Sequence, residues 1–147
     1  MYDLARNDGE VAFINAREKD TCMPKAIKIV HGTDDDDICH IDVKIFEYDE
    51  LLKTNMWHHI DVKDVEEKNF KTGKYSLSKA FVVFHKTYKP YGYYTAFRVI
   101  QNSIRTNRFV LVNTQDMLSL CELEDKDTYS LVALKEIMQR CNYKIVG

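Results

Sequence analysis

The sequence is poor in the residues that interrupt regular structure, with five glycines and two prolines among 147 residues. It has no low-complexity tract, so extended disorder is not expected. No apolar run approaches the roughly 18 residues needed to cross a bilayer, and the first ten residues lack the apolar core of a secretion signal. We therefore expect a soluble, cytoplasmic protein that does not insert into a membrane.

Several common signatures of chemistry are missing as well. The four cysteines are far apart and form no Cys-x-x-Cys or zinc-type cluster, which disfavours structural zinc and favours a reducing compartment. The chain contains no glycine-rich phosphate loop, no Gly-x-Ser-x-Gly elbow and no Cys/His nucleophile arrangement. P-loop nucleotide hydrolysis is therefore set aside, and the sequence leaves open whether the protein is an enzyme.

The chain does contain enough apolar side chain for one globular domain over residues 1–147, since 45% of its residues are hydrophobic and 12% aromatic. Its periodicity predicts an α+β or mixed α/β fold: one mixed sheet of about five strands with two or three main helices. The predicted strands lie at 25–32, 38–46, 57–65, 80–86, 109–112 and 143–146. The predicted helices lie at 49–55, 93–107, 116–120 and 129–141.

Acidic residues are absent from residues 68–115, which contain nine Lys and Arg residues, whereas residues 1–67 contain 17 acidic and 8 basic residues. Aromatic residues alternate with these cations. Cations neutralise phosphates and aromatic rings stack on bases, so residues 68–108 predict a surface that binds nucleic acid, a nucleotide or another polyanion. The alternative is that the cations decorate solvated faces with tyrosines packed beneath them. The candidate polyanion-binding residues are Lys71, Lys74, Tyr75, Lys86, Lys89, Tyr91, Arg98, Arg105 and Arg108.

The pentapeptide His-Ile-Asp-Val-Lys occurs twice, at 40–44 and 59–63, and strand alternation puts its His, Asp and Lys on one face. Asp42, followed after 18 residues by Asp61-Val62-Lys63, resembles the D…(D/E)-x-K pattern of PD-(D/E)xK nucleases, although no proline precedes Asp42. The resemblance implies that Asp42 and Asp61 bind Mg²⁺ and that Lys63 stabilises charge at the scissile phosphate, which makes these three the candidate catalytic residues. The alternative is the solvated face of an antiparallel sheet with cross-strand ion pairs.

A third pattern consists of two His-x-Thr tripeptides, at residues 31–33 and 85–87, each predicted at the end of an apolar strand. Two-histidine phosphoesterases use two such strands, but their middle residue is usually apolar, whereas here it is Gly32 and Lys86. The sequence therefore predicts polyanion binding first. The alternatives are a Mg²⁺-dependent nuclease and a non-catalytic interaction or inhibitor protein that docks onto another protein or onto a second copy of itself.

Overall fold

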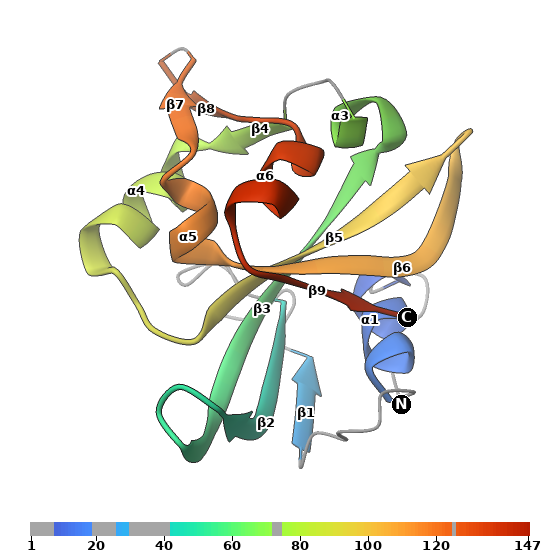
Figure 1. The fold of residues 1–147 in the computed structure, drawn as a ribbon, viewed down its shortest axis with the longest axis vertical. Coiled ribbons are helices and arrows are strands. Elements are labelled where there is room, and N and C mark those ends of the chain that lie inside the picture. The colour runs from blue at the N-terminus through green and yellow to red at the C-terminus, as the bar shows by residue number, and fades with distance from the viewer. Residues whose placement is uncertain (1–7, 19–25, 30–41, 72–74, 125) are drawn as a thin grey trace.

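The computed structural model describes residues 8–18, 26–29, 42–71, 75–124 and 126–147. These residues form a six-stranded mixed sheet, a separate three-stranded sheet and five short helices (Figure 1). The predicted α+β class with a mixed main sheet is confirmed. In the described part of the chain, no helix has the length and apolar character needed to span a bilayer.

The main sheet has the strand order β1 (Ala26–Ile29), β2 (Val43–Asp49), β3 (Thr54–Glu66), β5 (Tyr93–Gln101), β6 (Ile104–Asn113) and β9 (Tyr143–Val146). All neighbouring pairs are antiparallel except β3 and β5. A parallel pair requires a long crossover connection. Here the crossover consists of α3 (Glu67–Lys71), β4 (Tyr75–Ser78) and α4 (Lys79–Tyr88).

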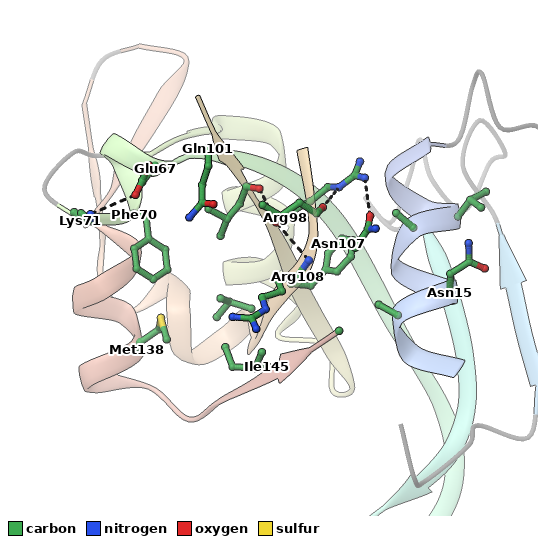
Figure 2. Close-up of a pocket in the computed structure, with 18 residues that line it drawn as sticks. Asn15, Glu67, Phe70, Lys71, Arg98, Gln101, Asn107, Arg108, Met138 and Ile145 are labelled. Atoms are coloured by element: carbon green, nitrogen blue, oxygen red, sulfur yellow. Dashed lines mark hydrogen bonds and ion pairs between the residues drawn. The ribbon is translucent and has the colours of Figure 1, made fainter. Parts of the chain in front are cut away.

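The remaining elements are a small second sheet and three further helices. β4 pairs with β8 (Thr128–Leu131), and β8 pairs with β7 (Cys121–Leu123), which gives the small sheet. The other helices are α1 (Asp8–Glu18), α5 (Thr114–Leu118) and α6 (Leu134–Arg140). Where β5 turns into β6, α1 lies on one side of the strands and α3 and α6 lie on the other (Figure 2).

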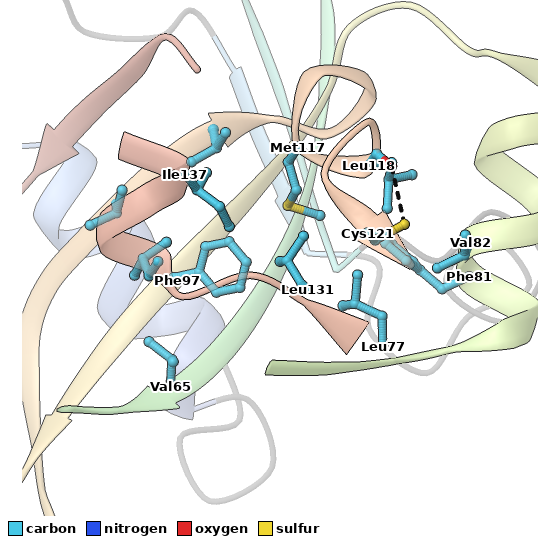
Figure 3. Close-up of a cluster of buried hydrophobic side chains, with 13 residues drawn as sticks. Val65, Leu77, Phe81, Val82, Phe97, Met117, Leu118, Cys121, Leu131 and Ile137 are labelled. Atoms are coloured by element: carbon cyan, nitrogen blue, oxygen red, sulfur yellow. Dashed lines mark hydrogen bonds between the residues drawn. The ribbon is translucent and has the colours of Figure 1, made fainter. Parts of the chain in front are cut away.

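Each face of the main sheet has its own hydrophobic core. On one face, α1 packs Phe13 edge-on against Phe109, with 5.3 Å between the ring centroids. On the other face, Phe97, Leu131 and Ile137 belong to a larger buried cluster that also joins the small sheet, α4, α5 and α6 (Figure 3). A sheet with apolar groups on both faces is well anchored, so side chains that project from its strands have defined positions.

The predicted helix at 49–55 is wrong, because these residues form the tight connection between β2 and β3. The Asp49 carboxylate accepts a hydrogen bond from the backbone N–H of Leu52 at 2.8 Å, which is a turn contact. Lys53 adopts a left-handed backbone conformation with φ of 55°. An acidic residue before a short apolar pair predicts such a turn as well as a helix start.

The predicted strand at 80–86 is also wrong, since these residues lie in α4. Ser78 caps that helix by accepting a hydrogen bond from Phe81 N at 3.3 Å, and Phe81, Val82 and His85 are its buried residues. Conversely, the predicted helix at 93–107 is a hairpin of β5 and β6. Its two turn residues, Asn102 and Ser103, have φ of 51° and 64°, as a type I′ turn requires.

The remaining predicted elements agree with the structure at least in part. The strands at 57–65, 109–112 and 143–146 correspond to β3, β6 and β9, and the helix near 116–120 corresponds to α5, which Asn113 caps. The strands at 25–32 and 38–46 correspond in part to β1 and β2, and residues 30–41 lie outside the described residues. The predicted helix at 129–141 is correct only over α6, because its first residues belong to β8.

Candidate functional site

The start of β2 brings Asp42 onto the edge of β3. The backbone N–H of Asp42 donates to Ile60 O at 2.8 Å, and Ile60 is also the partner of Val43 in the strand register. Asp42 therefore hydrogen-bonds to β3 directly before the paired residues of β2 begin. The Asp42 carboxylate, 6% exposed, accepts a hydrogen bond from Val62 N at 2.8 Å. It therefore lies against the backbone segment that joins Asp61 to Lys63.

Asp61 and Lys63 share one face of β3 and form an ion pair, with 2.8 Å between Lys63 Nζ and Asp61 Oδ2. Both side chains are largely shielded from solvent, and the Lys63 ammonium also lies 4.6 Å from the centroid of the Phe81 ring in α4. Burial alone would lower the pKa of Lys63. The charges of Asp61 and Asp42 and the hydrogen bond that Lys63 donates to Asp61 outweigh this effect, so the pKa is raised. The structure thus brings the three predicted catalytic residues together.

Tyr75 of β4 adds a phenol to this group. Its ring packs edge-on against Phe97 at 5.6 Å between centroids. Burial raises the pKa of Tyr75, and the negative charge of Asp61 raises it further, while the positive charge of Lys63 opposes the shift. Tyr75 therefore stays protonated at neutral pH. It was predicted to bind a polyanion, and the structure places it within electrostatic reach of the D-x-K pair.

The donor set of this cluster fits Mg²⁺ better than zinc. Among the described residues, no group of three or more His, Cys, Asp or Glu side chains is placed to hold a metal ion. A zinc site needs three or four such protein ligands. Mg²⁺ is commonly bound through one or two carboxylates while it keeps several waters, so Asp42 and Asp61 are sufficient protein ligands for it.

The cations predicted to bind a polyanion are spread over separate elements. Lys71 lies on α3, Lys86 and Lys89 lie on α4 and its C-cap, Arg98 lies on β5, and Arg105 and Arg108 lie on β6, whereas Lys74 lies outside the described residues. Carboxylates next to the acid-free segment neutralise several of its cations. These ion pairs are Lys68–Glu66 at 3.5 Å, Lys71–Glu67 at 3.3 Å and Arg105–Asp64 at 3.3 Å. Among the described residues, three of the nine cations of the acid-free segment are therefore paired with carboxylates.

Two further predicted polyanion-binding residues have internal partners. Arg98 is 5% exposed, and its Nε donates to Thr106 O at 2.7 Å while the guanidinium lies over the Phe109 ring at 6.0 Å. The Tyr91 hydroxyl donates to Asp49 Oδ1 at 2.9 Å. These contacts occupy both side chains within the fold.

The opposite face of β2 and β3 holds a buried network that the sequence did not predict. His58 lies between two carboxylates, with Nδ1 3.0 Å from Glu47 Oε1 and Nε2 2.9 Å from Asp49 Oδ2. Arg17 of α1 donates to Glu47, and Tyr91 donates to Asp49. The only available signal was the spacing of Glu47 and Asp49, which puts both on one face of a strand. Because a helix was predicted to start at Asp49, the position of Glu47 and Asp49 on one face of a strand was not recognised.

The electrostatics of this network favour a charged histidine. Burial would lower the pKa of His58, but hydrogen bonds and the negative charges of Glu47 and Asp49 raise it overall. Burial would raise the pKa of each carboxyl group, and their hydrogen bonds and the charge of His58 lower both values overall. The network therefore favours the imidazolium form of His58 between its two carboxylates, and it is suited to stabilising the fold because both ring nitrogens are already engaged.

The structure does not support the two-histidine phosphoesterase hypothesis, which required His85 to lie at the end of a strand. His85 lies on a helix, not on a strand, and is 1% exposed. Its ring centroid lies 4.6 Å from that of Phe81 and 5.3 Å from that of Tyr93. The other tripeptide, at 31–33, lies outside the described residues.

Comparisons of the chain with protein-family models, with curated proteins and with solved structures found no match. The assignment of function therefore depends on side-chain geometry. By that criterion, the meeting of Asp42, Asp61 and Lys63 is the strongest candidate site in the described residues.

Proposed function

We propose that this protein is a Mg²⁺-dependent hydrolase of nucleic-acid phosphodiesters, with Asp42, Asp61 and Lys63 as its active site. One observation favours this function over the others: the Asp42 carboxylate binds Val62 N–H, between an aspartate and a lysine that are themselves 2.8 Å apart. These are the residues of the D…D-x-K pattern. Their meeting is specific, because it depends on the hydrogen bond of Asp42 to the β3 backbone as well as on strand alternation.

Each residue has a role that follows from its contacts. The backbone hydrogen bond holds the Asp42 carboxylate in one orientation, which prepares it to act with Asp61 as a ligand. When bound, Mg²⁺ supplies Lewis-acid polarisation of the phosphate and a water of lowered pKa. The raised pKa of Lys63 keeps its ammonium group charged, so it can stabilise the negative charge that develops on the phosphate oxygens.

The substrate class follows from cations on the neighbouring helix. α4 contacts Lys63 through Phe81, and the same helix carries exposed Lys86 and ends at exposed Lys89. A phosphate backbone that crosses α4 would meet these cations close to the active site. Nucleic acid, the polyanion first expected from the sequence, is therefore the proposed substrate.

The test compares Asp61→Asn with Asp64→Asn, a matched substitution on the same strand. Asp64 forms an ion pair with exposed Arg105 and lies outside the proposed active site. Labelled single-stranded and duplex DNA and RNA are incubated with each protein and Mg²⁺ or Mn²⁺. We expect Asp61→Asn to lose cleavage and to retain nucleic-acid binding, whereas Asp64→Asn retains both.

If the unmodified protein cleaves none of these substrates, the nuclease proposal is wrong. Salt-dependent binding without cleavage would then support a polyanion-binding protein. A stable protein partner that co-purifies without nucleic acid would support the interaction or inhibitor class instead.

A further inference from the structure

A cavity of about 1040 Å³ lies where β5 turns into β6. Alternation along β6 divides its lining, because Asn107 and Phe109 face α1 while Arg108 and Val110 face the opposite side. Figure 2 shows the Arg108 side chain directed toward Phe70, Met138 and Ile145, whereas the Arg98 guanidinium is directed toward Asn107. The half that contains Arg108 is lined by Phe70, Lys71, Gln101, Arg108, Met138 and Ile145.

The charge in this half is positive. Lys71 and Arg108 are both exposed, and Glu67 is the only acidic side chain among the described residues that line the cavity. Lys71 pairs with Glu67 at 3.3 Å, an exposed pair of the kind that contributes little and separates easily. Among the described residues, no carboxylate forms an ion pair with Arg108. A planar guanidinium in this position can bind the oxygens of a phosphate through two parallel hydrogen bonds.

The other groups suit a nucleobase. Phe70 provides an aromatic surface and Met138 a polarisable thioether, and both kinds of side chain pack well against flat rings. Gln101 provides an amide that can donate to and accept from a base edge. A cavity with apolar walls and a few convergent polar groups is typical of a small-molecule site.

We propose that the Arg108 half of this cavity binds a nucleoside monophosphate, with its phosphate on Arg108 and Lys71 and its base against Phe70 and Met138. The site is distinct from the proposed active site, because Asp42, Asp61 and Lys63 do not belong to the cavity lining. It goes beyond the proposed hydrolase function, since nucleotide binding here needs neither Mg²⁺ nor cleavage.

The test is isothermal titration of the four nucleoside 5′-monophosphates, the corresponding nucleosides and inorganic phosphate, all in EDTA. At least one monophosphate is expected to bind about tenfold or more tightly than its nucleoside and than phosphate, the gain of one charge-assisted hydrogen bond. In Arg108→Gln, this tenfold preference for the monophosphate over its nucleoside should disappear. Arg105→Gln is the matched control, because Arg105 lies three residues away on the same strand and pairs with Asp64, outside the cavity lining.

Phe70→Leu separates a nucleotide from a simple anion. We expect it to weaken monophosphate binding about fivefold, the lower range for loss of one stacking contact, and to leave phosphate binding unchanged. No binding by the unmodified protein, equal affinity in Arg108→Gln, or equal affinity for the nucleoside would each overturn the proposal. Monophosphate binding that is unchanged in Phe70→Leu would also overturn it, because it would show that only the anion is recognised. Asp61→Asn should bind the nucleotide normally, so failure of the hydrolase function is distinguishable from failure of this site.

Discussion

Replacing His58 with glutamine should destabilise the protein strongly, and by an amount that depends on pH. His58 is 6% exposed, and its two ring nitrogens contact Glu47 and Asp49 at 3.0 and 2.9 Å. Glutamine can donate to one carboxylate but carries no charge, which leaves the other carboxylate without this donor. Loss of a buried cation from such a pair costs about 3 kcal/mol or more, and hydrogen bonds to charged groups contribute about 1.5–3 kcal/mol each. We expect His58→Gln to lose about 3 kcal/mol at pH 6.

The pH dependence follows from the raised pKa of His58. A raised folded-state pKa stabilises the protein fully below the unfolded value of 6.5, and this stabilisation is lost as the pH rises through the higher folded-state value. The difference between the native protein and His58→Gln should therefore be largest at pH 6, decline as the pH rises above 6.5, and be smallest above the folded-state pKa. At the acidic end the lowered pKa values of Glu47 and Asp49 act in the opposite direction, so their stabilisation is lost as the pH falls through those values.

The measurement is urea unfolding of both proteins from pH 6 to pH 9.5, with the free energy of unfolding extrapolated to water. Lys68→Gln is the control, because Lys68 and Glu66 form an exposed pair at 3.5 Å that should contribute less than about 1 kcal/mol throughout this range. A cost of His58→Gln that is the same at every pH would show that His58 is not charged in the folded protein. A cost below about 1 kcal/mol at pH 6 would show that the network does not stabilise the fold.

Three further substitutions test the fold by urea unfolding. Ser78→Ala should cost about 1 kcal/mol, because it removes the side chain that caps α4. Ser103→Gly should stabilise the β5–β6 hairpin by about 0.5 kcal/mol, because glycine accepts the φ of 64° without strain. Ile137→Ala should cost about 4 kcal/mol, because Ile137 is fully buried among the side chains shown in Figure 3 and its loss leaves a cavity. An unchanged midpoint in any of the three would contradict the corresponding contact.

The candidate site was predictable in part. Asp61 and Lys63 are two residues apart, and strand alternation alone puts them on one face. Asp42 is different, because it lies before β2 and its carboxylate meets Val62 N–H only through the pairing of β2 with β3. The register of two paired strands depends on both strands and cannot be read from the residue types of one of them. The motif could therefore be predicted from its residue types and spacing, while its geometry could not.

The errors in the fold have a common cause in buried segments. Residues 95–98 of β5 are all buried, because β3 and β6 pair with β5 on both sides and helices or other strands cover both faces. A strand buried in this way loses its two-residue period, so the spacing of Tyr93, Phe97, Ile100 and Ile104 imitates a helix. The apolar run at 80–86 is ambiguous for the same reason, and the cap at Ser78 was the local signal that favoured a helix.

The parallel pairing of β3 with β5 brings an acidic and a basic segment of the sequence side by side in the fold. It puts the acidic end of β3 beside the basic strands, with Asp64 opposite Arg98 in register and paired with Arg105. The cations that remain exposed without a carboxylate partner among the described residues include Lys89 at the end of α4 and Arg108 in the cavity. Lys89 lies on the proposed path of the nucleic-acid substrate, whereas Arg108 lies in the proposed nucleotide site.

Lys89→Gln and Arg108→Gln should therefore have complementary effects. Lys89→Gln removes a cation from the proposed path of the substrate backbone, so it should raise KM for cleavage and reduce the salt dependence of nucleic-acid binding by about one charge, while nucleotide affinity stays the same. Arg108→Gln should weaken nucleotide binding and leave KM unchanged when no nucleotide is present. Steady-state cleavage and titration on the same protein preparations measure both. If either substitution changes both properties equally, the two cations belong to one continuous binding surface, and the separation of the two sites is wrong.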